Sequence, residues 1–448
     1  MENLLSKDNL IIFTTAPTGL GHIRVMDALL DGLPEGVDVK EVGVQNISAA
    51  KIHRLGSVFP FLQKITEFYQ TNPMAEKIAA GVYKAYHHSK TKEITARLKE
   101  LKVKFPNKKN WLIVSTHHAF AHEIEYIKGK LERNLGIKIL LFVIMTDDSP
   151  QRVWVINNAD IIFSPSERTS LKIHSMLKSN SAAKIITISF PVSPRLTKRL
   201  TDEEFNQISG QFDNAQKQPL HIEIPISGAA VQLDFFKKLI DSLKQEKIKF
   251  TIVGQDSIYT KMFFTHLGKN QNVGLLIGRG AKQTVNYYES LFYQSPRPGV
   301  EITKPSEQCF KSILKPNEQG GVVLLLTNPV GRQEQDNLNF LVRHDLIPDT
   351  KHQEKLFSIL LTSAKGGPAF GWNMQELSYW TYRASHWRGV RLPSNSKDAA
   401  EFIINLKQSG ILLAMLSYVS HKKKELTSGG VAQIWEEIDK FLGYNKRA

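Results

Sequence analysis

The chain has 448 residues, more than one compact core usually holds, so we expect two domains. Hydrophobic residues make up 42% of it and charged residues 23%, which is ordinary for a globular protein and excludes disordered and collagen-like classes. Cys309 is the only cysteine, which excludes an internal disulfide framework and a multi-cysteine metal site and fits a reducing compartment.

Lysine and arginine number 58 against 43 acidic residues, a formal net charge of +15. Such an excess favours anionic partners, among them nucleotides, nucleic acid and the anionic face of a membrane, although solubility alone is an equally good reason for it. No run of about 18 apolar residues predicts a transmembrane helix, and the polar residues 1–9 do not resemble a signal peptide. We therefore expect a cytoplasmic protein.

The first predicted unit is a strand over residues 10–14, a turn with Gly19 and Gly21, and a helix over residues 23–33. Glycines let the backbone approach a ligand closely, and a helix amino terminus favours negative charge. The turn lacks the third glycine of the dinucleotide fingerprint, and no clear acidic residue closes the second strand, so NAD binding is not expected. His22, directly after the second glycine, is either a functional residue of this turn or simply the cap of the helix.

Residues 50–105 interleave aromatic and basic side chains at helical spacing. This pattern is typical of a helix that lies at a membrane surface, and it is equally typical of helices that cover a sheet. Both interpretations stay open at this point.

Three further segments, residues 111–118, 139–148 and 160–166, each join a buried strand to a polar carboxyl end. Together with the first strand they predict one parallel sheet with a polar rim, where open α/β sheets bind their ligands. His118 or Asp147 could act there as a general base, although the adjacent histidine and aspartate leave the choice open. No metal site is expected at these strand ends.

A polar segment over residues 200–219 is interpreted as a helix and a linker, and we place the domain boundary there. A strand over residues 220–226 follows, then a turn with Ser227 and Gly228 and a helix that ends near residue 243. This arrangement repeats the phosphate-suited geometry of the first unit and predicts a second, similar α/β domain. Further strands are expected over residues 250–253 and 273–277, and further helices over residues 398–411 and 431–442.

A buried strand over residues 322–326 leads into the strongest functional signal of the chain. Gln333, Glu334 and Asn337 span four positions just beyond it, so one helical turn can aim all three side chains at one small polar molecule. A sugar, whose hydroxyls need paired donors and acceptors, is the expected ligand.

Four motifs point to one family: Gly-x-Gly-His at residues 19–22, the Ser-Thr-His and Thr-Asp strand ends, Thr303-Lys304-Pro305, and Gly331-Arg332-Gln333-Glu334 followed by Asn337. They resemble motifs of the monogalactosyldiacylglycerol and diglucosyldiacylglycerol synthases and of MurG, over roughly residues 10–345. The resemblance implies an α/β fold of the GT-B type, in which two Rossmann-like domains with parallel sheets face each other across a cleft that holds the active site. The implied parts are an acceptor domain over residues 1–200, a nucleotide-sugar domain over residues 219–395, and helices over residues 396–448 that pack back toward the first domain.

The resemblance implies that a hexosyl group moves from a UDP-sugar to the hydroxyl of a lipid-type acceptor, with inversion and without an essential metal or any cofactor besides the donor. The expected partners are a nucleotide sugar and a lipid acceptor at an anionic membrane surface, with the enzyme peripheral at its inner face and no nucleic acid bound. His22 is implied as the catalytic base, with Asp147 and His118 as the other catalytic candidates. The implied donor-binding residues are Gly21, Ser227, Gly228, Thr303, Lys304, Glu307, Gly331, Arg332, Gln333, Glu334 and Asn337.

One position departs from this family. The relatives place a glutamate nine positions after Thr303, where it bonds the donor ribose, but this chain has Ser312 there. Either Glu307 takes over that role or the donor differs. Two alternatives therefore stand beside the transferase: a UDP-sugar 2-epimerase of the same fold, and a non-catalytic descendant that binds a nucleotide sugar.

Overall fold

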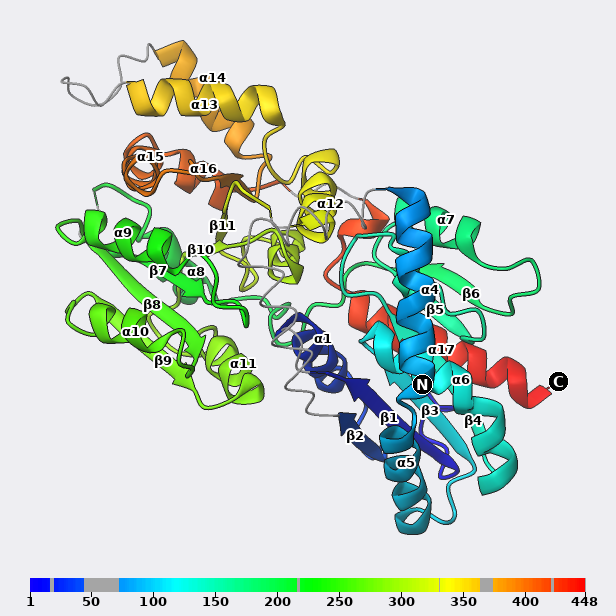
Figure 1. The fold of residues 1–448 in the computed structure, drawn as a ribbon. Helices are drawn as coiled ribbons and strands as arrows, with labels where there is room; N and C mark the ends of the chain where they lie inside the picture. Colours follow the sequence, from blue (N-terminus) through cyan, green and yellow to red (C-terminus); the bar gives the residue numbers. More distant parts are fainter. Residues whose placement is uncertain are drawn as a thin grey trace. The chain divides into compact units, whose positions relative to one another are not determined.

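The computed structural model describes residues 1–16, 20–43, 72–215, 218–329, 331–362, 374–419 and 423–447 (Figure 1). The predictions on Gly19 and on residues 50–71 fall outside these ranges. The chain divides into two compact units. Unit 1 comprises Met1–Arg195, Gly331–Gln333 and Lys423–Ala448, and unit 2 comprises Leu196–Val330 and Glu334–Lys422.

Six parallel strands form the sheet of unit 1, in the order β2-β1-β3-β4-β5-β6. Strands β1, β3 and β4 are buried along nearly their whole length, which is typical of a parallel sheet covered on both faces. The order reverses beside β1, because the chain passes to β2 on one side and later to β3 on the other. Such a reversal opens a crevice at the carboxyl ends of the strands, where ligands bind.

The elements of unit 1 are β1 (Asn9–Thr15), α1 (Leu20–Asp31), β2 (Val39–Gly43), α4 (Pro73–Ser89), α5 (Lys92–Lys104), β3 (Asn110–Ser115), α6 (His118–Leu135), β4 (Lys138–Ile144), η1 (Arg152–Trp154), β5 (Ile161–Ser164), α7 (Glu167–Met176), β6 (Lys184–Thr187), η3 (Lys424–Leu426) and α17 (Gly430–Arg447).

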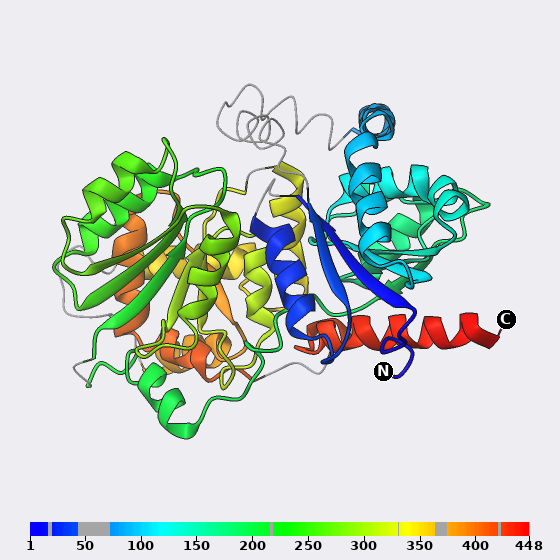
Figure 2. The same ribbon diagram turned by 90° about the horizontal axis from the view of Figure 1, so that it is seen from below.

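The carboxyl-terminal helix α17 belongs to unit 1, although the chain reaches it only after unit 2. Figure 2 shows it, in red, beside the amino-terminal segment in dark blue. The indole Nε1 of Trp435 donates to the carbonyl oxygen of Leu29 at 3.0 Å, and the main-chain N–H of Leu4 donates to Asp439 at 2.9 Å. The ring of Trp435 also meets Phe13 of β1 edge to face, with centroids 6.1 Å apart. These contacts tie the last helix to the first strand.

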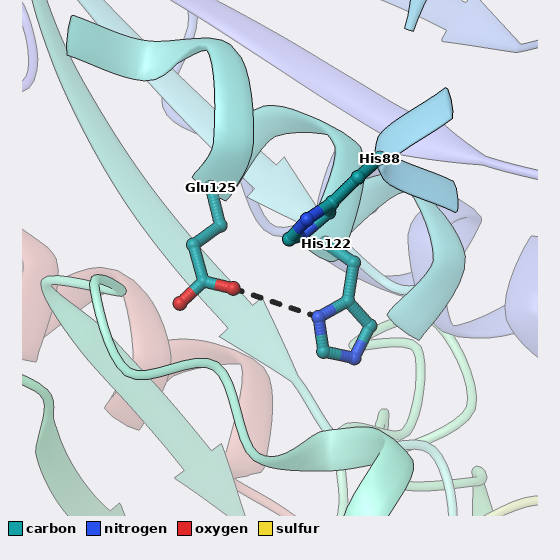
Figure 3. A group of neighbouring side chains, drawn as sticks. All are labelled: His88, His122 and Glu125. Atoms are coloured by element: carbon teal, nitrogen blue, oxygen red, sulfur yellow. Dashed lines mark ion pairs between the residues drawn. The ribbon is translucent and has the colours of Figure 1, made fainter. Parts of the chain in front are cut away.

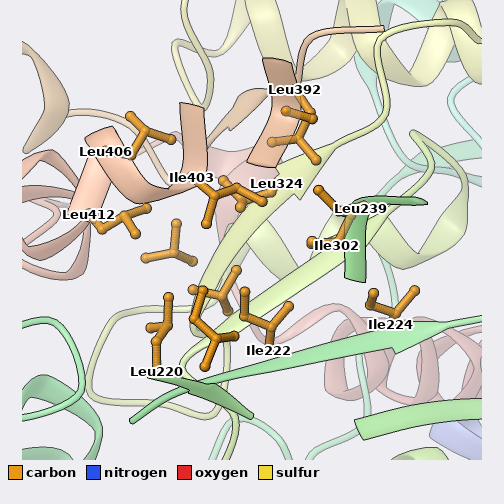
Figure 4. Close-up of a cluster of buried hydrophobic side chains, with 14 of the residues drawn as sticks. Leu220, Ile222, Ile224, Leu239, Ile302, Leu324, Leu392, Ile403, Leu406 and Leu412 are labelled. Atoms are coloured by element: carbon orange, nitrogen blue, oxygen red, sulfur yellow. The ribbon is translucent and has the colours of Figure 1, made fainter. Parts of the chain in front are cut away.

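Unit 2 has its own six-stranded parallel sheet, in the order β12-β11-β10-β7-β8-β9. This is the strand order of the doubly wound dinucleotide-binding fold, and its reversal lies between β7 and β10. Apolar side chains from β7, β10 and β11 pack against α9, α15 and α16 (Figure 4). Burial of each leucine or isoleucine in this core contributes about 1.5–3 kcal/mol before conformational entropy is counted.

The elements of unit 2 are α8 (Asp202–Ser209), β7 (Leu220–Pro225), α9 (Leu233–Leu243), β8 (Ile248–Gln255), α10 (Lys261–Leu267), β9 (Val273–Gly278), α11 (Ala281–Ser290), β10 (Val300–Thr303), η2 (Glu307–Ile313), β11 (Val322–Leu325), α12 (Gly331–Arg343, its first three residues grouped with unit 1), α13 (Thr350–Thr362), α14 (Met374–Ala384), β12 (Gly389–Arg391), α15 (Ser396–Gln408) and α16 (Ile411–Leu416).

The predicted fold class is confirmed: the chain is an α/β protein with two Rossmann-like units, each built on a parallel sheet. The polar motifs stand at the carboxyl ends of six predicted strands. In the structure these strands are β1, β3, β4, β5, β7 and β11. Among the helices of the described ranges, none is both long enough and apolar enough for a membrane span.

Candidate functional site

The first candidate site lies where β1 and β3 end, at the reversal of strand order in unit 1. Gly21 and His22 belong to the first turn of α1, whose main-chain N–H groups have no acceptor within the helix. Nδ1 of His22 lies 2.7 Å from the carbonyl oxygen of Thr116, and the Thr116 hydroxyl donates back to the carbonyl of His22 at 3.0 Å. Since a carbonyl only accepts, Nδ1 carries the proton, and in the neutral ring Nε2 holds the lone pair.

One further side chain, Thr146, links His22 to a buried carboxylate. The hydroxyl oxygen of Thr146 lies 3.3 Å from Nδ1 of His22, and this hydroxyl donates to Asp147 at 3.3 Å. Asp147 is 6% exposed. Gln333, which is grouped with unit 1, also donates its side-chain amide to Asp147. Thr146 therefore lies between the His22 ring and the Asp147 carboxylate.

His118 has a different partner, Tyr83. The Tyr83 hydroxyl lies 2.7 Å from Nδ1 of His118. Burial, with the charges of neighbouring histidines, lowers the pKa of His118 well below its ordinary value of 6.5. Burial, reinforced by Glu123, raises the pKa of Tyr83, so the hydroxyl keeps its proton. The neutral His118 ring holds a lone pair on one of its two nitrogens and remains a candidate base.

The adjacent histidine and aspartate serve the local structure. Nδ1 of His117 accepts from the main-chain N–H of Ala119 at 3.1 Å and caps α6. Asp148 is fully buried and accepts from the Ser166 hydroxyl and, at 2.8 Å, from the Thr169 hydroxyl at the start of α7. These hydrogen bonds give His117 and Asp148 structural contacts, so His118 and Asp147 stay the candidates for a base at these two strand ends.

The second candidate site lies where β7 and β10 end, at the reversal of strand order in unit 2. Ser227 and Gly228 follow β7, and the Ser227 hydroxyl oxygen is buried without a hydrogen-bond partner. Gly228 is exposed, and a Cβ built there would meet no atom within 4 Å. A buried hydroxyl that lacks a partner and stands beside open space is suited to a polar ligand.

The end of β10 supplies charge to the same site. Thr303 closes the strand and is buried, and the next residue, Lys304, forms an ion pair with Glu334 of α12. The two charged side chains are 16% and 12% exposed, so solvent screens the pair only partly. Glu307 begins η2 and is half-buried. Ser312, farther along η2, is 1% exposed and faces the interior.

The first turn of α12 contributes to both units. Gly331 begins the helix with a φ of 77°, a left-handed conformation that favours glycine. Arg332 forms an ion pair with Glu76 at 3.3 Å within unit 1. Glu334 and Asn337 stand three residues apart and so share one face of the helix in unit 2, where Asn337 is fully buried.

Three residues of the first site were given no role from the sequence. Thr116 and Thr146 follow β3 and β4 directly and belong to the polar strand ends, but no separate role was predicted for them. Tyr83 comes from α4, far from the strands, and nothing in the local pattern connects it with His118.

No protein-family model matches the chain, and no curated protein matches it. Solved structures that match most of it include Anabaena Alr3699/HepE in complex with UDP and glucose (12% identity, 97% of this chain and 99% of that chain, TM-score 0.43). Two others are S. aureus MnaA with UDP (9%, 97% and 96%, TM-score 0.46) and Acinetobacter baumannii MurG (11%, 96% and 99%, TM-score 0.42). At such identities and with TM-scores below 0.5, no property of these proteins is transferred to this chain. Its own topology defines the class, an α/β protein of two Rossmann-like units.

Proposed function

We propose that the protein is a metal-independent, inverting hexosyltransferase that moves a sugar from a UDP-sugar to the hydroxyl of a lipid-type acceptor. The observation that carries this proposal is the hydrogen-bonded state of His22. Its Nδ1–H donates to the carbonyl of Thr116, so the lone pair of the neutral ring is on Nε2. Thr146 links the ring to the carboxylate of Asp147. This is the arrangement that a general base requires.

In the proposed reaction the acceptor oxygen attacks the anomeric carbon of the sugar while its proton passes to Nε2 of His22. The new glycosidic C–O bond forms as the bond between that carbon and the diphosphate oxygen breaks. UDP leaves with the bonding electron pair, and attack from the opposite side inverts the anomeric centre. Asp147 acts as a positioning residue, since it stabilises the protonated ring through Thr146. A base of this kind contributes about 10²–10⁴-fold to the rate.

Unit 2 supplies the proposed donor site. The Ser227 hydroxyl and the exposed Gly228 offer a donor and close main-chain access for a diphosphate. Lys304 stands at the end of the neighbouring strand and is the cation for the leaving group, held in place by Glu334. Glu307 replaces Ser312 as the proposed partner of the ribose, because Ser312 is buried.

An exposed apolar stripe on α4 supports a lipid-type acceptor. Met74, Ile78, Val82 and Tyr86 recur every fourth residue, so they share one face of the helix, and each is between 50% and 75% exposed. Apolar side chains gathered in this way on a solvent-facing helix favour a partner with hydrocarbon surface. The positive net charge is compatible with an anionic membrane face.

The experiment compares UDP binding and sugar transfer for wild type, His22→Ala and the matched control His174→Ala, an exposed histidine of α7. UDP binding is measured by isothermal titration and transfer with a radiolabelled UDP-hexose and a lipid extract. We expect His22→Ala to bind UDP normally and to lose about 10²–10⁴-fold in transfer, and the control to match wild type. Full turnover of His22→Ala would overturn the role of the base.

The same assay separates the two alternatives. A transferase releases UDP only when a lipid acceptor is present, whereas a 2-epimerase converts the UDP-sugar without any acceptor. A non-catalytic binder gives UDP binding and neither reaction. Failure of the wild type to bind any UDP compound would contradict all three.

A further inference from the structure

Helix α4 is attached to unit 1 almost entirely through polar contacts. None of its side chains is fully buried. Lys84 forms an ion pair with Glu125 at 2.8 Å, and His87 pairs with Glu123 at 2.8 Å. His88 stacks on Tyr126, with ring centroids 4.3 Å apart. A helix fastened in this way gains little from the hydrophobic effect, so its attachment depends on specific polar links to α6.

One group of side chains between α4 and α6 has no role in the proposed reaction. His88 of α4 and His122 and Glu125 of α6 direct two ring nitrogens and one carboxylate toward one another (Figure 3). The three ligand atoms all lie within 4.8 Å of one another. His122 and Glu125 are buried and His88 is half-buried.

Each of the two histidines presents a buried ring nitrogen that makes no hydrogen bond. Nε2 of His122 lies 3.0 Å from the carbonyl oxygen of Val153, so Nε2 donates and Nδ1 of the neutral ring holds the lone pair. That Nδ1 is buried, has no hydrogen-bond partner, and faces a carboxylate oxygen of Glu125 at 3.5 Å. Nε2 of His88 is also buried without a partner. The Lys84 ammonium already pairs with this carboxylate, and the two converging ring nitrogens offer further ligand atoms to a cation.

We propose that His88, His122 and Glu125 bind a divalent transition-metal ion, with Zn²⁺ as the best match. Two imidazole nitrogens and one carboxylate oxygen are ligands that Zn²⁺ accepts, at about 2.0–2.2 Å. The bond from His122 to the Val153 carbonyl is the outer contact that metal-bound histidines usually make, and it fixes the tautomer that exposes Nδ1. Small side-chain rotations bring the three atoms to the spacing of a tetrahedral site.

The fourth ligand of this site is water. A pocket of about 330 Å³ opens beside the cluster and shares Lys84, His88 and Glu125 with it. Its remaining lining is mostly polar, with three asparagine side chains and Lys178, so it admits water readily. Lys84 competes with the metal, because its ammonium occupies the Glu125 oxygen that faces His122. That lysine side chain is 31% exposed and can turn into the pocket when the ion binds.

The consequence of metal binding is mechanical. Ligands from α4 and α6 on one ion clamp the two helices together, which compensates for the missing apolar contacts of α4. Tyr83, five residues before His88 on the same helix, then stays in place against His118. The ion makes no contact with the donor in this proposal, so it is compatible with transfer chemistry that needs no metal.

The primary test is Zn²⁺ binding to the full-length protein after treatment with a chelator, measured by competition with a chromogenic zinc indicator. We expect one ion per chain for wild type, binding weakened at least about 10-fold in His88→Ala, and wild-type affinity in His87→Ala. His87 is the matched control, because it neighbours His88 and pairs with Glu123 instead. Equal binding by wild type and His88→Ala would overturn the proposal.

A second variant distinguishes a metal site from a simple ion-pair cluster. Lys84→Met removes the competing ammonium, so Zn²⁺ should bind more tightly than to wild type. If the three residues form only an ion-pair cluster, Lys84→Met should instead lose stability and bind Zn²⁺ no more tightly than wild type. Hydrogen exchange supplies an independent readout, with added Zn²⁺ expected to slow exchange in α4 of wild type and not of His88→Ala. Unchanged exchange in wild type on saturation with Zn²⁺ would contradict the clamp.

Discussion

The strongest stability prediction concerns Lys311, which is buried in η2 of unit 2. Its ammonium lies 2.9 Å from Glu223 and also pairs with Glu301. The two glutamates are neighbours in register on β7 and β10. Burial raises the pKa of Glu223 well above its ordinary value, whereas for Glu301 burial is outweighed by Lys311, which lowers the pKa. One ammonium therefore neutralises one ionised carboxylate, and the other carboxyl stays protonated.

Replacement of Lys311 by methionine leaves Glu301 without its counter-ion. The carboxyl then has to bind a proton to remain buried, and from an ordinary pKa of 4.5 this costs about 3.4 kcal/mol at pH 7. Loss of one partner from a buried ion pair typically costs about 3–5 kcal/mol, in agreement with this figure. For a unit of this size the melting temperature should fall by about 7–14 °C.

The penalty depends on pH in a defined direction. In Lys311→Met the folded-state pKa of Glu301 is raised above the unfolded value, so the folded state is favoured at low pH and loses stability as the pH rises. At pH 5 the proton costs only about 0.7 kcal/mol. The difference in melting temperature between wild type and variant should therefore be small at pH 5 and large at pH 7.

Thermal unfolding followed by circular dichroism at the two pH values tests this reasoning. The matched control is Lys238→Met, which breaks an ion pair on the surface. The side chain of Lys238 is 62% exposed and that of its partner Asp234 is 75% exposed. The control substitution should cost less than about 1 kcal/mol. Adding Glu301→Gln to Lys311→Met should recover part of the lost stability. A fall in melting temperature that is equal at pH 5 and pH 7 would refute the electrostatic explanation.

Two further predictions follow from contacts in unit 1. Gly430→Ala should destabilise the protein by about 1–3 kcal/mol in urea unfolding, because a Cβ there would lie 2.2 Å from a main-chain carbonyl oxygen. The control is Gly81→Ala in α4, where a Cβ would meet no atom within 4 Å; it should stabilise the protein by about 0.5–1 kcal/mol. Equal effects of the two substitutions would contradict the packing argument. Tyr83→Phe removes the hydroxyl that contacts His118 and should reduce sugar transfer far less than His22→Ala. A loss as large as that of His22→Ala would assign His118 to the chemistry.

Most strands of the two sheets could be predicted because they are apolar on both faces. β1, β3, β4 and β11 are short runs of valine, leucine, isoleucine and phenylalanine between polar turns. β10 was not predicted, since a glutamate stands in the middle of its four residues. That glutamate is stabilised by Lys311 from η2 and by the Tyr288 hydroxyl, contacts that no local pattern reveals. β2 and β12 are short edge strands, and the same reasoning overlooks them.

The candidate site was only partly within reach of the sequence. The polar strand ends indicated where His22, Asp147 and Ser227 would lie, because parallel strands present their carboxyl ends at one edge. The hydrogen-bond partners could not be predicted in this way: Nδ1 of His22 donates to the carbonyl of Thr116, whereas Nδ1 of His118 lies against the Tyr83 hydroxyl. The proposed metal-ligand set was not predicted, because His88 is 34 residues from His122 and on another helix.

The strand order of unit 1 also has an evolutionary consequence. His22 and Thr116 touch although 94 residues separate them, because β1 and β3 are neighbours in the sheet. Helices α4 and α5 lie between β2 and β3 in the chain and add no strand to the sheet. Such helices can be changed or exchanged while the histidine and its carbonyl partner keep their positions. Under the proposed function, the surface that α4 offers to an acceptor can therefore diverge while the proposed proton-transfer residues are inherited unchanged.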